Sequence, residues 1–244
     1  MKIKQLIKRF LPNSIVYNYY SFIRNSYSQA GQDFWVYGEV NNRLKGGYFI
    51  EVGSNDGITY NNTFILESRF KWKGLCIEAN PDIYIELKKN RRTICINACI
   101  SDSENEVIFK KEGLDGGIIF DMANANKTNL SSNFVTLKTY TLEKLFIKYN
   151  VPFVVDYLSM DIEGAEWHAL KDFPFDKYRF NSMTIERPDA NLRNLLQENN
   201  YIVIKEIPGL DVFYIHKSCI HSYQVNLMNF WEINKKKENQ LTYE

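Results

Sequence analysis

A short apolar run that breaks into a glycine-punctuated acidic turn constrains the fold of this chain more than any other feature. The run over 48–52 is β-branched, aromatic or apolar except at Glu51, which is typical of a strand buried on both faces of a parallel sheet. Gly53 and Gly57 bracket the turn, where glycine permits a positive φ and a close approach to a ligand. Residues 61–68 then predict the start of a helix. A strand, a glycine turn and a helix in this order predict the ligand-binding end of an α/β unit.

The residues of this turn argue against two familiar ligands. A phosphate-binding P-loop ends in Gly-Lys-Ser/Thr, whereas residues 56–58 place a carboxylate where the lysine belongs. A dinucleotide fingerprint needs a second glycine two residues after Gly53, where Asn55 stands, and an acidic residue would repel a pyrophosphate. The spacing of Glu51, Gly53 and Gly57 instead suits S-adenosylmethionine, because carboxylates face its two cationic groups and bare amides receive its carboxylate. The alternative is a buried strand and a tight turn without a ligand.

A second strand brings the acidic residue expected for a ribose. The apolar run over 72–78 ends at Glu78, at the place where nucleotide-binding α/β proteins set a carboxylate that accepts hydrogen bonds from two ribose hydroxyls. A third strand is predicted over 93–98 and is followed by Ser101 and Asp102, which are candidates to meet an adenine amino group. Asp102 is equally well interpreted as a turn former before the next strand.

A second group of acidic residues lies farther along the chain. A buried strand ends at Asp161, and Glu163 and Glu166 follow where a helix is predicted to begin near Gly164. These are too many carboxylates for helix capping alone, although acids do favour a helix N-terminus. A further strand over 182–186 also ends in a carboxylate, and residues 201–205 and 212–216 predict a hairpin that finishes the sheet. Four strands would then deliver acids to one edge of an open α/β sheet, where ligands bind: Glu51, Glu78, Asp161 and Glu186.

Taken together, these motifs resemble the FkbM family of S-adenosylmethionine-dependent methyltransferases. The resemblance spans about residues 28–216 and is carried by the segments 28–33, 49–57, 74–81, 156–166 and 184–186. It implies an α/β, class I (Rossmann-like) methyltransferase fold, with a seven-stranded, mostly parallel sheet flanked by helices and an antiparallel last strand. It also implies O-methylation of a hydroxyl on a sugar or natural product. Ala30, Glu51 and Ala79 depart from the residues that the family more often has, which are glycine, aspartate and proline.

The resemblance also implies a cofactor site. The turn after the first strand would hold the methionine end of S-adenosylmethionine, Glu78 the ribose and Asp102 the adenine. Gln29 precedes a predicted helix over 34–44 and either lines the mouth of the cleft or belongs to a capped helix start. The predicted cofactor-binding residues are Gln29, Glu51, Gly53, Asn55, Asp56, Gly57, Glu78, Ala79, Ser101, Asp102 and Asp161.

Methyl transfer to an alcohol depends on positioning, and on a base or a metal that assists loss of the hydroxyl proton. Such assistance is worth on the order of two to four decades in rate. We assign Asp161 to orient the cofactor's amino group or the substrate, and Glu163 or Glu186 to act as the base. His168 is a further candidate, with a packing role as its alternative. Chelation of Mg²⁺ by Asp161 and Glu186 ranks below acid–base chemistry, because ion pairs and the helix dipole also explain the acids.

Length and charge place the chain among ordinary globular proteins. Its 244 residues suit one α/β domain, and a formal charge of +1 gives no sign of a nucleic-acid partner. Four cysteines without a Cys-x-x-Cys pair predict reduced core residues, and no signal peptide or transmembrane run is apparent, so we predict a cytoplasmic protein.

The domain is predicted over 28–234, with appendages at both ends. Residues 1–27 are predicted to begin with a basic amphipathic helix. In the favoured interpretation this helix packs on its own domain or on a partner. In the alternative interpretation, residues 1–11 rest on an anionic membrane surface. Residues 111–135 predict a weakly structured, substrate-side loop, and 235–244 a solvated tail.

The acceptor is predicted from the family resemblance alone, as a nucleotide-linked or glycan-linked sugar of a bacterial surface polysaccharide. Two alternatives share the fold. One is a nicotinamide-dependent oxidoreductase acting on a nucleotide sugar, and the other is a non-catalytic Rossmann-like scaffold.

Overall fold

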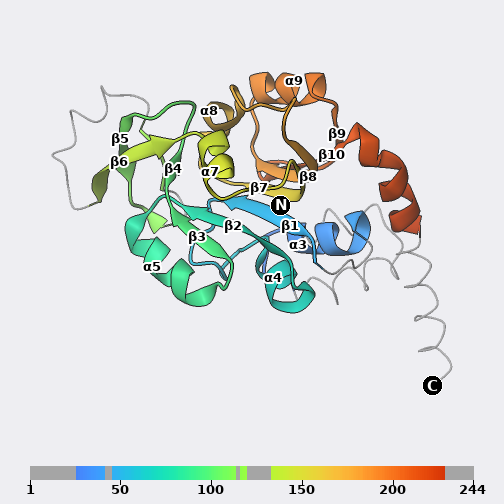
Figure 1. Cartoon of the computed structure of the whole chain (residues 1–244), viewed down its shortest axis with the longest axis horizontal. Coiled ribbons are helices and arrows are strands. Elements are labelled where there is room, and N and C mark those ends of the chain that lie inside the picture. The colour runs from blue at the N-terminus through green and yellow to red at the C-terminus, as the bar shows by residue number, and fades with distance from the viewer. Residues whose placement is uncertain (1–25, 42–45, 114–115, 120–132, 229–244) are drawn as a thin grey trace.

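A computed structural model of the protein describes residues 26–41, 46–113, 116–119 and 133–228. Its centre is a seven-stranded sheet in the order β3-β2-β1-β7-β8-β10-β9 (Figure 1). These strands are β1 (Tyr48–Val52), β2 (Lys73–Glu78), β3 (Ile94–Asn97), β7 (Val154–Met160), β8 (Arg179–Glu186), β9 (Tyr201–Glu206) and β10 (Asp211–His216). Strand β1, which carries Glu51, therefore lies inside the sheet, between β2 and β7.

All strands from β3 to β8 in this order pair in parallel, and β10 is antiparallel to both of its neighbours. This arrangement confirms the predicted class I methyltransferase fold, and the pairing of β9 with β10 confirms the predicted hairpin. Because the carboxyl ends of β1, β2, β7 and β8 meet at one edge, the acids that end these strands are brought together there.

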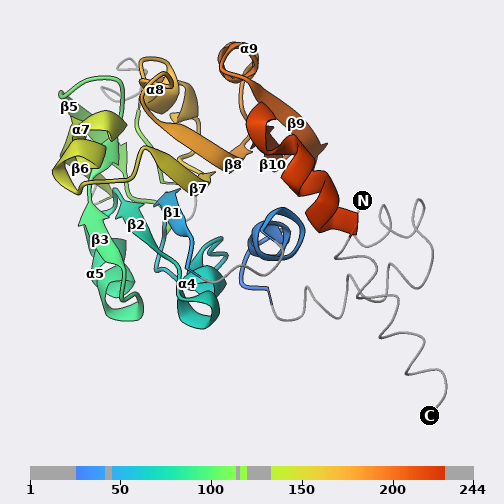
Figure 2. The ribbon, with the colours of Figure 1, turned by 45° about the vertical axis from the view of Figure 1, so that its right-hand side comes forward.

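Helices cover both faces of the sheet (Figure 2). One face carries α7 (Leu142–Lys148), α8 (Glu166–Leu170) and α9 (Ala190–Glu198). The other carries α3 (Gln32–Phe34), the π-helix η1 (Trp35–Val40), α4 (Phe64–Phe70), α5 (Pro81–Asn90) and a helix over 220–228. Successive residues of β1 serve the two cores, since Phe49 packs with Leu66 and Leu87, and Ile50 with Phe146. The apolar run over 48–52 is thus buried on both faces, as its composition predicts.

A second sheet of three strands lies beside the first, in the order β4-β6-β5. Its strands are β4 (Cys99–Ile100), β5 (Glu106–Lys110) and β6 (Phe134–Tyr140). Most of the loop predicted over 111–135 lies outside the described residues, and its last two residues belong to β6, which begins at Phe134. The pairing of β6 with β5 joins segments far apart in the chain, which no local pattern reveals.

Several smaller predictions concern the ends of helices. Thr141 caps α7 by accepting a hydrogen bond from the backbone N–H of Lys144. The helix predicted over 34–44 is described only as far as Asn41, and α8 begins at Glu166 rather than near Gly164. The amphipathic segment at 1–11 and the tail at 235–244 lie outside the described residues. Within the described part of the chain, the helices lack the combination of length and apolar composition that crossing a membrane requires.

Candidate active site

A cleft opens at the carboxyl edge of β1, β2 and β7 and encloses about 800 Å³, part of it open to solvent. The residues that line it include six of the predicted site residues: Gly53, Asn55, Glu78, Ala79, Asp161 and Glu163. Apolar side chains line it as well, among them Ile77, Ile83, Ile100 and Phe109.

Gly53 lines this cleft and also joins β1 to β7. Its φ is +86°, and a Cβ at this position would lie 1.8 Å from the carbonyl oxygen of Asp161. A hydrogen bond of 3.0 Å from the Asp161 N–H to the Val52 carbonyl ties the ends of β1 and β7, and one of 3.0 Å from the Gly53 N–H to the Ile77 carbonyl ties the end of β1 to β2. The glycine is therefore required by the close approach of Asp161, in addition to any approach of a ligand.

Glu78 is held rigidly at the rim of the cleft. One carboxylate oxygen accepts a hydrogen bond of 2.9 Å from the backbone N–H of Asn55, and the other accepts one of 2.8 Å from Asn80. Burial raises the pKa of Glu78, and these backbone hydrogen bonds oppose the rise. Because an ionised carboxylate has about four acceptor positions, Glu78 retains the capacity to accept hydrogen bonds from hydroxyl groups of a ligand.

Glu51 is turned away from the cleft, into the structure. It accepts hydrogen bonds from the Asn61 side chain at 2.8 Å, the Asn62 N–H at 2.9 Å and the Thr63 hydroxyl at 2.8 Å. The guanidinium of Arg91 lies 3.5 Å away. Glu51 therefore fixes the loop between β1 and α4, and a direct contact with a ligand is not part of this arrangement.

Other residues predicted for the methionine end also lie outside the cleft lining. Asp56 accepts hydrogen bonds from the backbone N–H groups of Ile58 and Thr59, at 2.8 and 2.7 Å, and so closes the turn on itself. A Cβ on Gly57 would lie 2.7 Å from Arg91, which explains this glycine by packing. Exposed Gln29 adjoins Ser28, which forms an isolated bridge with the cleft residue Tyr60. Gln29 is thus near the mouth without lining it.

Ser101, Asp102 and His168 belong to a separate pocket, together with Thr141 and other residues of α7 and α8. Asp102 pairs with Lys171 and lies 3.3 Å from Nδ1 of His168. The hydrogen bond from Lys171 holds the pKa of Asp102 well below its usual range. The structure therefore does not bring Ser101 and Asp102 to the cleft as adenine contacts. It also places His168 in this separate pocket, away from the predicted base residues.

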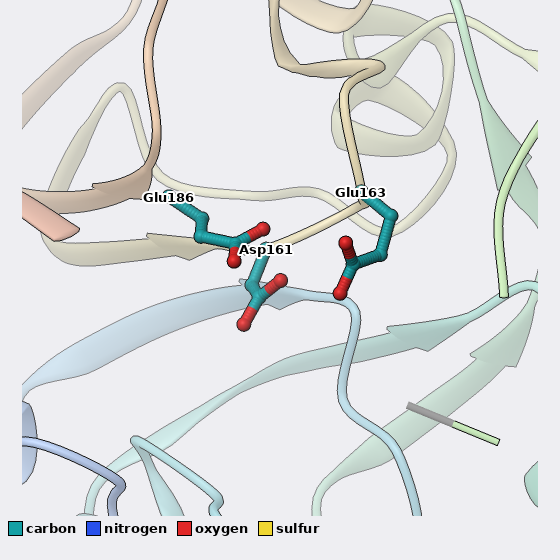
Figure 3. A group of neighbouring side chains, drawn as sticks. All are labelled: Asp161, Glu163 and Glu186. Atoms are coloured by element: carbon teal, nitrogen blue, oxygen red, sulfur yellow. The ribbon is translucent and has the colours of Figure 1, made fainter. Parts of the chain in front are cut away.

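Three carboxylates gather beside the cleft, from Asp161, Glu163 and Glu186 (Figure 3). Oxygen atoms of all three lie within 4.8 Å of one another. Asp161 follows β7 directly, Glu186 ends β8, and Glu163 takes a left-handed φ of 54° in the turn before α8. Asp161 and Glu163 line the cleft, whereas Glu186 lies behind them. Burial, and next the neighbouring Glu186, raise the pKa of Asp161 to about 9.

Sequence reasoning missed two residues that complete this group. Asp211 begins β10 directly opposite Glu186, and it accepts a hydrogen bond of 2.8 Å from the Gln32 side chain. Burial raises the pKa of Asp211 to about 6, although the hydrogen bond from Gln32 opposes the rise. Arg187 donates to Glu163 at 2.6 Å and pairs with Glu186 at 2.8 Å. An antiparallel strand starts at the edge where its parallel neighbours end. An acid at the start of the predicted last strand, here Asp211, could therefore have been assigned to the same edge from the sequence.

These features fit a nucleoside-type cofactor. Glu78 offers acceptors for ribose hydroxyls, apolar side chains form walls against which a flat base can pack, and Gly53 and Asn55 of the turn line the same cleft. The carboxylates of Asp161 and Glu163 lie on the same lining and suit a cationic group or an acceptor hydroxyl.

Comparisons with known proteins bear on the kind of protein this is. A family model described as "Methyltransferase FkbM domain" matches residues 51–203. Among solved structures, a methyltransferase from Pyrococcus furiosus is 14% identical, with 84% of this chain and 83% of that chain covered and a TM-score of 0.36. A precorrin-6y C5,15-methyltransferase from Geobacter metallireducens is 10% identical, with 79% and 91% covered and a TM-score of 0.40.

The N-terminal domain of human METTL16 in complex with SAH is 10% identical, with 85% of this chain and 71% of that chain covered and a TM-score of 0.39. Such low TM-scores carry no argument of their own. No curated protein sequence matches the chain. The family match spans the cleft residues Gly53, Glu78 and Asp161 and reaches past Glu186.

Proposed function

Because the chain belongs to the FkbM methyltransferase family and uses S-adenosylmethionine, we propose that it methylates a hydroxyl group of a sugar. The sugar is carried by a nucleotide or by a glycan of a bacterial surface polysaccharide. Family membership removes the basis for the two alternatives, an oxidoreductase and a non-catalytic scaffold.

The observation that carries the proposal is the pair of carboxylates, Asp161 and Glu163, on the lining of the same cleft as Glu78. A hydroxyl is a weak nucleophile, and a carboxylate within hydrogen-bond reach both orients it and takes its proton.

Each cleft residue has a distinct task in this proposal. Glu78 binds the ribose hydroxyls, and the methionine end lies against the part of the cleft lining formed by Gly53 and Asn55. S-Adenosylmethionine, when bound, supplies a methyl group on a cationic sulfur that leaves as a neutral thioether. Asp161 and Glu163 hold the acceptor hydroxyl, and Glu163 accepts its proton while the new O–C bond forms and the C–S bond breaks. The products are a methyl ether, S-adenosylhomocysteine and a protonated carboxyl group, so charge and atoms balance.

A labelled-methyl assay tests the proposed acceptor. The full chain is incubated with S-adenosylmethionine carrying a deuterated methyl group, and with a panel of nucleotide sugars and of oligosaccharides. We expect mass spectrometry to find the label on a sugar oxygen, in equal amount to the S-adenosylhomocysteine formed. Glu163→Gln should lower turnover far more than affinity for S-adenosylhomocysteine, because Glu163 is assigned to the acceptor.

Transfer of the label to a nitrogen or carbon atom would refute the O-methyltransferase proposal. Transfer to a hydroxyl of a non-sugar natural product would refute only the substrate class. Unchanged turnover of Glu163→Gln would place the base elsewhere.

A further inference from the structure

Glu186 carries a buried carboxylate oxygen to which none of the described residues donates a hydrogen bond. The residue is 8% exposed, and the oxygen concerned is Oε2. Its other oxygen, Oε1, pairs with the guanidinium of Arg187. A buried carboxylate oxygen that accepts no hydrogen bond is costly, so binding of a ligand by this atom would be favourable.

The surroundings of this oxygen are themselves acidic. Figure 3 shows the Glu186 carboxylate directed toward Asp161, with Glu163 on the other side of Asp161. Oxygen atoms of the three side chains lie within 4.8 Å of one another. Opposite oxygens around an octahedral Mg²⁺ are about 4.2 Å apart, so small side-chain rotations bring all three onto one ion.

Acidic side chains outnumber basic ones around this oxygen among the described residues. Arg187 pairs with Glu163 and Glu186, and Asp211 adds a further carboxylate, directly opposite Glu186 in the sheet. Gln32 donates one hydrogen bond to Asp211 but brings no charge. Clustered buried carboxylates are stable together when they bind a cation, and oxygen-only donors select hard divalent ions.

We propose that Asp161, Glu163 and Glu186 bind a hard divalent cation of the Mg²⁺ or Mn²⁺ type at the acceptor side of the cleft. The inference deepens the proposed function and rests on it for the role of the ion, since the cation would bind the acceptor hydroxyl. A bound cation stabilises the alkoxide, lowers the pKa of the hydroxyl and lets its proton pass more readily to a carboxylate of the group. The ion would share the Glu163 and Glu186 carboxylates with Arg187.

Direct titration with Mn²⁺ tests the site without any methyl acceptor. The full chain is stripped with a chelator, and free Mn²⁺ is followed by electron paramagnetic resonance as MnCl₂ is added. We expect saturable binding of one Mn²⁺ per chain, displaced by Mg²⁺, with Ca²⁺ as a second competitor. Absence of saturable binding in the wild-type chain overturns the proposal.

Variants locate the ion. Glu186→Gln is expected to weaken Mn²⁺ binding by at least about tenfold, and Glu163→Gln, whose side chain is 25% exposed, is a second test that perturbs the fold less. Glu143→Gln, an acid on α7 paired with Lys177, is the matched control and should bind Mn²⁺ like the wild type. Arg187→Gln should tighten binding, because it removes a positive charge that competes for the same carboxylates. Wild-type Mn²⁺ affinity in both Glu186→Gln and Glu163→Gln overturns the proposed ligands.

The outcome is separable from that of the proposed function. S-Adenosylhomocysteine binding, measured in the same samples, reports whether each variant keeps an intact cofactor site. If Mn²⁺ binds as expected and no sugar is methylated, the cation site stands and the acceptor class falls. If sugars are methylated equally well after chelation and without saturable Mn²⁺ binding, the acceptor class stands and the cation site falls.

Discussion

Replacing Gly53 by alanine tests the physical reason for the glycine in the turn after β1. An added Cβ would lie 1.8 Å from the Asp161 carbonyl oxygen, whereas ordinary contact begins at 3.4 Å. The carbonyl would have to retreat by the difference, about 1.6 Å. The end of β7 cannot move so far and keep the 3.0 Å hydrogen bond from Asp161 to Val52.

The cost can be estimated from these contacts. The left-handed φ of +86° costs an alanine about 1–2 kcal/mol. Each buried backbone group that loses its partner adds about 1–3 kcal/mol, and one such bond is broken at least. We therefore expect Gly53→Ala to lower the free energy of unfolding by about 4 kcal/mol. For a domain of this size that corresponds to a fall in Tm of about 10 °C.

Gly209→Ala is the matched control. Gly209 has a φ of +80°, but an added Cβ would meet nothing within 4 Å. Only the conformational cost of about 1–2 kcal/mol should appear, which corresponds to a fall in Tm of about 4 °C. Urea and thermal unfolding followed by circular dichroism measure both. Equal losses in the two variants would refute the close contact between Gly53 and Asp161 as the reason for the glycine.

Two further predictions concern buried charges in the same half of the domain. Glu78→Gln must turn an amide NH₂ toward a backbone N–H of Asn55 or Asn80. We therefore expect calorimetry to show that the affinity for S-adenosylhomocysteine falls by about one to two decades, whereas the exposed control Glu106→Gln keeps the wild-type affinity. Unaltered affinity in Glu78→Gln would remove Glu78 from the ribose site. Arg91→Leu leaves the buried Glu51 and Glu67 carboxylates without their cation and should cost about 3–5 kcal/mol in urea unfolding. The exposed pair of Arg193 and Glu206 gives the contrast, since Arg193→Leu should cost about 1 kcal/mol or less, and equal costs would contradict the role of burial.

The central sheet could be predicted because its strands are marked locally. Each of β1, β2, β7 and β8 has an acid at or next to its carboxyl end, and the parallel arrangement places these ends at one edge. The small sheet was harder to predict from the sequence, because β6 becomes a strand by pairing with the distant β5.

Sequence position alone does not say which way a side chain at that edge points. Glu51 and Glu78 both lie at the ends of neighbouring strands, yet Glu51 turns into the loop before α4 while Glu78 lines the cleft. Asp102 follows β4 closely but pairs with Lys171 in another pocket. Partners such as Arg91 and Lys171 reach these acids from distant parts of the chain, so only the packed structure selects among them.

The sequence by itself determined the class of fold, the family and the edge of the sheet at which chemistry occurs, because strand composition and the acids that end the strands are local properties. The tertiary structure decided which acids share a site. Asp161, Glu163 and Glu186 meet because β7 and β8 are parallel neighbours, and Asp211 joins them because β10 runs in the opposite direction and starts where they end. Such a meeting depends on strand order and direction, which long-range pairing sets and no single stretch of sequence contains.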